Sequence, residues 1–111
     1  MKNAEIERTI SLDKDVSAVM SELPFKSEDM ALAAVKGYSS KIVHAPKWLS
    51  RGIETGGRDS VKFRLSMRQS EWEELQSAAD KACVSLSKAL NICMLHMFKD
   101  YEIIVRIPAN T

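Results

Sequence analysis

Residues 61–99, VKFRLSMRQSEWEELQSAADKACVSLSKALNICMLHMFK, decide the fold of this chain. Apolar and polar residues alternate strictly at the start of this segment, and a period of two is typical of a strand with one buried and one exposed face. The exposed face would carry Lys62, Arg64 and Ser66. The sequence therefore predicts a strand over 61–67 with a basic outer face.

Two helical segments follow this strand. Ser70 and Glu73 have the spacing of a capping box, in which the serine hydroxyl accepts a hydrogen bond from the third helical amide and the glutamate reaches back. Ser85 is predicted to cap the second helix, which is apolar around most of its circumference as far as Phe98. Such a helix must be buried on most sides, so we expect either a second chain or residues 5–40 to cover it.

Residues 5–40 have a loosely similar order of elements. Weak alternation over 5–12 predicts a short strand. Asp13 can cap a helix that Pro24 ends, and Ser27 opens a second helix. We expect this region to be either a degenerate strand-helix-helix unit or an unrelated N-terminal helical extension. The outer side of its strand would carry Glu7, Thr9 and Ser11.

The remaining segments separate and extend these two regions. Residues 41–60 contain Pro46, a Gly-Gly pair and little periodicity, which is typical of a connector. Residues 100–111 form a C-terminal tail, in which alternation over 101–107 predicts a further strand. The predicted fold class is mainly α with a short β-ribbon, and 61–99 is its best-defined unit.

The overall composition is that of an ordinary globular chain. Of the 111 residues, 45% are hydrophobic and 28% are charged, and the net charge is only +1. The charge is unevenly spread, since residues 1–31 hold four Lys or Arg against seven acids, a net −3, while 32–58 hold five against one, a net +4. Binding to nucleic acid must therefore depend on local patterning and not on bulk charge.

Signatures of enzymes and cofactor sites are missing from the sequence. It contains no P-loop, G-x-S-x-G, H-E-x-x-H or G-x-G-x-x-G motif. His44 and His96 are far apart, each without a nearby Cys/His/Asp cluster, and Cys83 and Cys93 have neither zinc nor disulfide spacing. We expect no enzymatic activity and no cofactor, and we expect both thiols to be free and buried.

No stretch of the sequence predicts a signal peptide or a membrane span. Charged residues follow soon after Met1, and the longest apolar run, 89–98, is interrupted by Asn91 and His96 and is too short to cross a bilayer. We expect a cytoplasmic protein with no membrane partner.

Residues 61–98 resemble the ribbon-helix-helix family of DNA-binding proteins, the Arc/MetJ type. The resemblance rests on the alternating strand VKFRLSM, the polar break RQS, the helix EWEELQSAADKA and the turn into VSLSKAL. It implies that two units intertwine, so that their strands form a ribbon and their helices share a core. The chain would be either a homodimer or an intrachain pseudo-dimer, like the tandem members found among conjugation accessory proteins.

The resemblance also implies a function, which is sequence-specific binding of double-stranded DNA by a transcriptional repressor or a plasmid or conjugation accessory factor. A two-stranded ribbon fits the major groove, where Lys and Arg can donate to guanine and Ser to several bases. By this resemblance the base-reading residues would be Lys62, Arg64 and Ser66. The phosphate-binding residues would be Ser85, Leu86, Ser87, Lys88 and Arg68. Weaker candidates on the second strand would be Glu7, Thr9 and Ser11.

One position departs from the family pattern, and one alternative function remains open. The family usually has glycine at the turn between the two helices, where a left-handed residue is favoured, but this chain has Cys83. The acidic N-terminal third and the alternating segment 101–107 are also compatible with a protein-interaction module, such as an antitoxin-like regulator that binds a partner protein.

Overall fold

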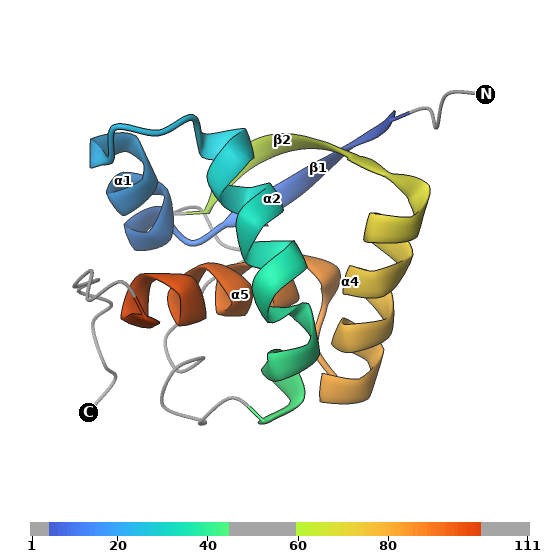
Figure 1. Cartoon of the computed structure of the whole chain (residues 1–111). Helices are drawn as coiled ribbons and strands as arrows, with labels where there is room; N and C mark the ends of the chain where they lie inside the picture. The colour runs from blue at the N-terminus through green and yellow to red at the C-terminus, as the bar shows by residue number, and fades with distance from the viewer. Residues whose placement is uncertain (1–4, 45–59, 101–111) are drawn as a thin grey trace.

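The chain folds as helices packed against one side of a two-stranded ribbon. A computed structural model describes residues 5–44 and 60–100 (Figure 1). The elements in chain order are β1 (Glu5–Leu12), α1 (Lys14–Glu22), α2 (Ser27–Tyr38), the 3-10 helix η1 (Ser39–His44), β2 (Val61–Arg68), α4 (Gln69–Ala82) and α5 (Leu86–Asp100). The prediction of a mainly helical fold with a short β-ribbon is confirmed. The strand predicted over 101–107 lies outside the described residues, as does most of the predicted connector.

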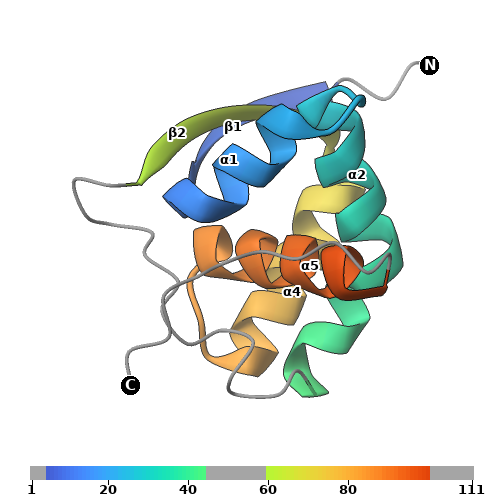
Figure 2. The same ribbon diagram turned by 90° about the vertical axis from the view of Figure 1, so that its left-hand side faces the viewer.

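The two strands pair antiparallel along their whole length. Glu5 lies opposite Arg68 at one end, and Leu12 lies opposite Val61 at the other. The predicted alternation appears in their burial, because every second side chain points to the helices. The residues that are buried beneath the ribbon are Ile10, Leu12, Leu65 and Met67. Figure 2 shows the ribbon along one side of the molecule and the helices beneath it.

The helices of the first half begin and end where local signals predict. The Asp13 carboxylate accepts a hydrogen bond of 2.8 Å from the amide of Asp15, which confirms the N-cap of α1. The backbone turns to an extended conformation at Leu23, immediately before Pro24, and α2 begins at Ser27. Residues 5–40 therefore contain a strand and two helices, in the same order as residues 61–100.

The predicted capping box of α4 is wrong in its register. The helix starts at Gln69, and the amide of Arg68 donates to Oε1 of Glu71 at 3.1 Å. Glu71 is therefore the capping glutamate in place of Glu73, and Ser70 lies within the first turn. The sequence offers acidic residues at both spacings, and the end of the paired strand at Arg68 determines which of them is used.

The turn between α4 and α5 is left-handed at Cys83. Cys83 has φ 58° and ψ 41°, and it is the one non-glycine residue with positive φ in the described part of the chain. The amide of Val84 donates to the Ala79 carbonyl and that of Cys83 to the Asp80 carbonyl, at 3.0 and 3.2 Å, which are the two bonds of a Schellman motif.

Cys83 is exposed, so the expectation that both thiols are buried is wrong for Cys83 and confirmed for Cys93.

The core surrounds α5, which is buried on nearly all sides as predicted. Its cover comes from the same chain, since α2 and β1 pack against it together with α4 and η1 (Figure 2). Trp72 from α4 is also buried, and its indole N–H donates to the Ile6 carbonyl of β1 at 2.8 Å. Residues 5–40 thus supply the partner that the apolar helix requires.

Candidate functional site

The outward face of the ribbon brings the predicted base-reading residues of both strands together. The strand register places Lys62 opposite Ser11, Arg64 opposite Thr9, and Ser66 opposite Glu7. Lys62, Arg64, Glu7 and Thr9 are exposed, while Ser11 and Ser66 are half-buried. The six residues form one continuous surface because side chains that share a face of paired strands lie next to one another.

Charge is unevenly distributed along this face. At the end near Leu12, the cation of Lys62 lies beside a hydroxyl, and its Nζ donates to Ser11 Oγ at 3.3 Å. At the other end Glu5 faces Arg68, and Glu7 lies within the same half. The end near Leu12 is therefore cationic and rich in hydroxyls, whereas the opposite end mixes both signs of charge.

The start of α5 is fastened to β1 at the cationic end. The amide of Ser11 donates to Ser87 Oγ at 3.1 Å, and the Ser11 carbonyl accepts from Asn91 Nδ2 at 3.0 Å. Ser87 and Asn91 are one helical turn apart, so together they satisfy both backbone groups of Ser11 on the free edge of β1. Asn91 Oδ1 also accepts from the Asp13 amide at 2.9 Å. We call these two side chains the α5 clamp.

The clamp places the predicted phosphate-binding residues next to the ribbon. Ser85 caps α5 as predicted, because its Oγ accepts from the Lys88 amide at 3.1 Å. The first intrahelical bond of α5 runs from the Ala89 amide to the Ser85 carbonyl. The amides of Leu86 and Ser87 precede that bond, so they are left to an external acceptor such as an anion.

Arg68 does not join this group, although the sequence placed it among the phosphate-binding residues. It lies opposite Glu5, at the far end of a strand of eight residues. At ~3.3 Å per residue, that is roughly 25 Å from the start of β2. The helix that begins on that side is α4, which starts at Gln69 and carries Glu71 in its first turn. A carboxylate in the first turn stabilises the helix N-terminus, but its negative charge repels a phosphate there.

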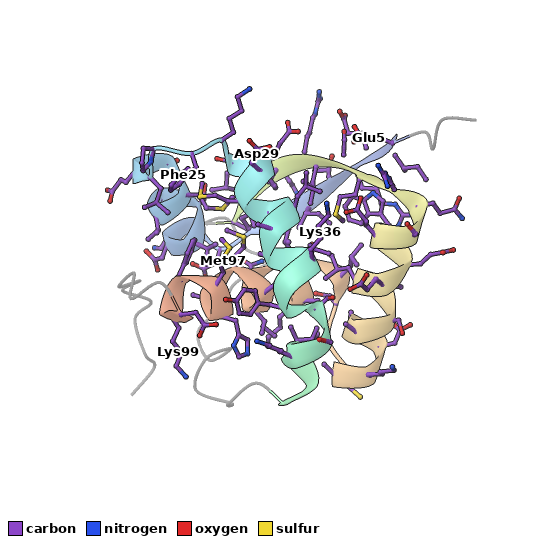
Figure 3. All side chains as sticks on the ribbon, in the orientation of Figure 1. Glu5, Phe25, Asp29, Lys36, Met97 and Lys99 are labelled. Carbon is purple, nitrogen blue, oxygen red and sulfur yellow. The ribbon has the colours of Figure 1, made fainter. Side chains whose placement is uncertain are left out.

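Three structural roles near this face were missed by the sequence analysis. Asn91 is fully buried, and its position within a run of apolar residues is a signal that could have identified it, since buried amides need partners. Arg8 is exposed, and its guanidinium lies 5.3 Å from the centre of the Trp72 ring. Lys36 on α2 pairs with Glu71 at 3.6 Å, and Figure 3 shows it on the surface beside α4.

Two titratable groups lie in the helical layer, away from the ribbon. Burial raises the pKa of the Cys93 thiol to about 12, so this thiol stays protonated at neutral pH. Burial, with a contribution from Lys99, lowers the pKa of His96 below 6.5. The His96 ring stacks on Tyr38, and the Tyr38 hydroxyl donates to Asp100 at 2.7 Å.

Within residues 5–44 and 60–100, no cluster of His, Cys, Asp and Glu has the composition of a metal site. None of the helices in the same ranges is long and apolar enough to cross a membrane. Scans against protein-family models, curated proteins and solved structures found no match to the chain.

Proposed function

We propose that this chain binds double-stranded DNA by placing the β1–β2 ribbon in the major groove, in the manner of a ribbon-helix-helix protein whose two units lie in one chain. The observation that carries the proposal is the joining of an exposed, cationic ribbon face to the capped start of α5 at a single residue, Ser11. A two-stranded ribbon has the width that the major groove admits.

The roles within this site follow from the chemistry of each group. Lys62 and Arg64 carry donors that suit guanine O6 and N7, and Ser66 or Thr9 can donate or accept. The free amides of Leu86 and Ser87, with the Lys88 ammonium nearby in sequence, suit a backbone phosphate. This division gives the ribbon the base contacts and α5 the contact that sets its position on the duplex.

The test is selection of a duplex from a random-sequence library, followed by binding titrations with two double variants. We expect Lys62→Ala/Arg64→Ala to lose at least about tenfold in affinity for the selected duplex, since each good base contact contributes about 1–3 kcal/mol of discrimination. Lys81→Ala/Lys99→Ala removes the same charge from the helix ends as the matched control, and we expect much less effect. Failure to enrich any duplex, or equal affinity of both variants, would overturn the proposal.

Salt dependence separates the two kinds of contact. Lys88→Ala should weaken binding to all duplexes alike and reduce the slope of log affinity against log salt concentration by about one. Arg64→Ala should instead relax the sequence preference. If both variants alter only the salt slope, the ribbon binds the backbone and does not read bases.

The alternative function, an antitoxin-like regulator that binds a partner protein, is favoured by one feature of the helical layer. Phe25 is 64% exposed beside an apolar groove, and exposed apolar surface of this kind marks interaction sites. Co-purification of one stoichiometric protein partner that is lost in Phe25→Ser would favour this alternative.

A further inference from the structure

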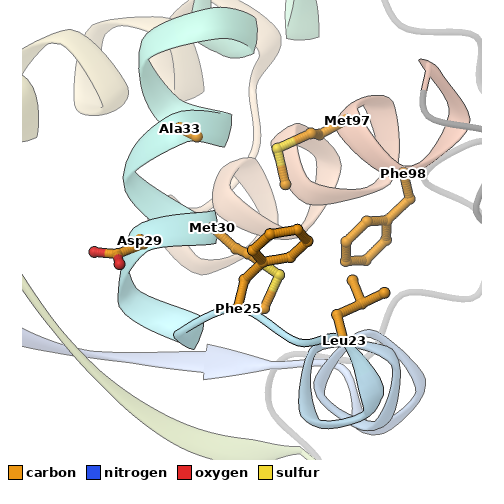
Figure 4. A pocket seen from close by; sticks show the side chains of 7 residues that line it. All are labelled: Leu23, Phe25, Asp29, Met30, Ala33, Met97 and Phe98. Atoms are coloured by element: carbon orange, nitrogen blue, oxygen red, sulfur yellow. The ribbon is translucent and has the colours of Figure 1, made fainter.

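An apolar groove opens where α1, α2 and the C-terminal end of α5 meet. Its walls carry Leu23 and Phe25 after α1, Met30 on α2, and Met97 and Phe98 on α5, and they enclose about 440 Å³. In Figure 4 these five side chains converge, while the carboxylate of Asp29 points away from them. Figure 3 shows Phe25 and Met97 on the same side of the molecule.

The matching place in the second half of the chain is already covered. There the segment that follows α2 continues as η1, which lies along α4 and also contacts α5. Ile42 of η1 is only 3% exposed and belongs to the core. The flank of the α4–α5 unit is thus closed by the chain that leaves the second helix of the other unit.

The sequence that spans the end of α5 and continues beyond it repeats the sequence that spans the end of α2. Residues 36–46 read KGYSSKIVHAP and residues 99–108 read KDYEIIVRIP. Both contain Lys-x-Tyr followed by Ile-Val, a basic residue, one further residue and Pro, and their spacing differs by a single residue. Ile42, a buried residue of η1, matches Ile104 in this repeat. Residues 101–108 lie outside the described part of the chain.

We propose that residues 101–108 dock in the apolar groove of their own chain, with Ile104 taking the place that Ile42 takes on the other side. Met97 and Phe98 form one wall of the groove, and α5 ends two residues later at Asp100. Four extended residues reach about 13 Å, which exceeds the 8–10 Å between packed helix axes. Ile104 can therefore cross from α5 to the side chains that follow α1.

Docking within the chain is favoured over docking of a second copy. A segment tethered at the wall of its own site has an effective local concentration in the millimolar range, far above that of a dilute partner. The groove is also almost wholly apolar, which matches the composition of the segment, with Tyr101, Ile103, Ile104, Val105 and Ile107. Covering Phe25 would remove the most exposed large apolar side chain of the described residues.

The test follows the methionine methyl groups by NMR in the full chain and in three variants. Removing residues 101–111, or introducing Ile104→Asp, should shift the methyl resonances of Met30 and Met97, which line the groove. The resonance of Met67, buried beneath the ribbon, should not move. Asn110→Asp adds the same charge to the same segment outside the repeat and should leave all three resonances unchanged.

Two further NMR measurements, the concentration dependence of the spectrum and a direct contact between Ile104 and Phe25, distinguish docking within one chain from docking between chains. We expect the full-chain spectrum to be independent of concentration, and Ile104 methyl protons to show nuclear Overhauser effects to the Phe25 ring within one molecule. The latter measurement needs no truncated variant, so it holds even where the shortened chain fails to fold. Unchanged Met30 and Met97 resonances in every variant, contacts only between molecules, or a concentration-dependent spectrum would overturn the proposal.

Discussion

Replacing Asn91 by alanine should destabilise the protein more than any other single change to the polar groups of the α5 clamp. Asn91 is fully buried and makes three hydrogen bonds, to the Asp13 amide, the Ser11 carbonyl and the Ser87 carbonyl, at 2.9, 3.0 and 2.7 Å. The Ser87 carbonyl keeps its intrahelical partner when the side chain is removed. The Asp13 amide and the Ser11 carbonyl would lose theirs.

The magnitude follows from these two groups. A buried polar group left without a partner costs about 1–3 kcal/mol, so Asn91→Ala, which leaves two such groups, should lower the free energy of unfolding by about 2–6 kcal/mol. That is a large share of the roughly 5–15 kcal/mol typical of a whole domain. Ser87→Ala removes one acceptor at a half-buried position, and we expect a smaller loss of about 1 kcal/mol.

Urea unfolding, followed by circular dichroism, measures the effect. The midpoint should fall while the slope stays the same, because the surface exposed on unfolding is unchanged. Asn91→Leu restores the lost volume without the hydrogen bonds, so it should also destabilise. A loss below about 1 kcal/mol in Asn91→Ala, or a stable Asn91→Leu variant, would refute the argument that unsatisfied backbone groups cause the effect.

Three further predictions concern the helical layer. Cys83→Gly should raise the free energy of unfolding by up to about 1 kcal/mol in urea titrations, because Cys83 occupies a left-handed position that suits glycine; Cys83→Ala should give no such gain. Iodoacetamide at mildly alkaline pH should label Cys83 alone in the folded protein, as judged by mass spectrometry, and labelling of Cys93 at a similar rate would contradict its burial and its pKa of about 12. Since the pKa of His96 is lower in the folded than in the unfolded chain, stability should fall as pH drops through 6.5, and His96→Gln should flatten that part of the urea stability profile; an unchanged profile would be evidence against the shift.

Local signals in the sequence predicted most elements of the fold, and their failures are local as well. Alternation identified both strands, and Asp13 and Ser85 cap their helices as expected. The capping residue of α4 was assigned wrongly because two glutamates have acceptable spacing, and only the extent of strand pairing distinguishes them. Helix ends are the least certain part of any assignment from sequence for this reason.

The candidate site was only half predictable, because its geometry depends on contacts between distant segments. Lys62, Arg64 and Ser66 follow from alternation within one strand, but their neighbours depend on the register with β1, which no local pattern specifies. The clamp joins Ser11 to Asn91, eighty positions along the chain. A single sequence shows that Asn91 interrupts an apolar helix, but it does not show which backbone groups that side chain satisfies.

The unequal ends of the ribbon have a consequence for the proposed binding of DNA. Ser87 and Asn91 hold the start of α5 against the end of β1 that lies beside Lys62, and no acid occurs in the first turn of α5. At the other end of the ribbon, β2 leads directly into α4, whose first turn carries Glu71. A phosphate would therefore be bound at one end of the ribbon and repelled at the other. If the ribbon enters the major groove as proposed, one orientation on the duplex should be favoured, so the selected sites should be asymmetric, whereas a symmetric dimer would select palindromes.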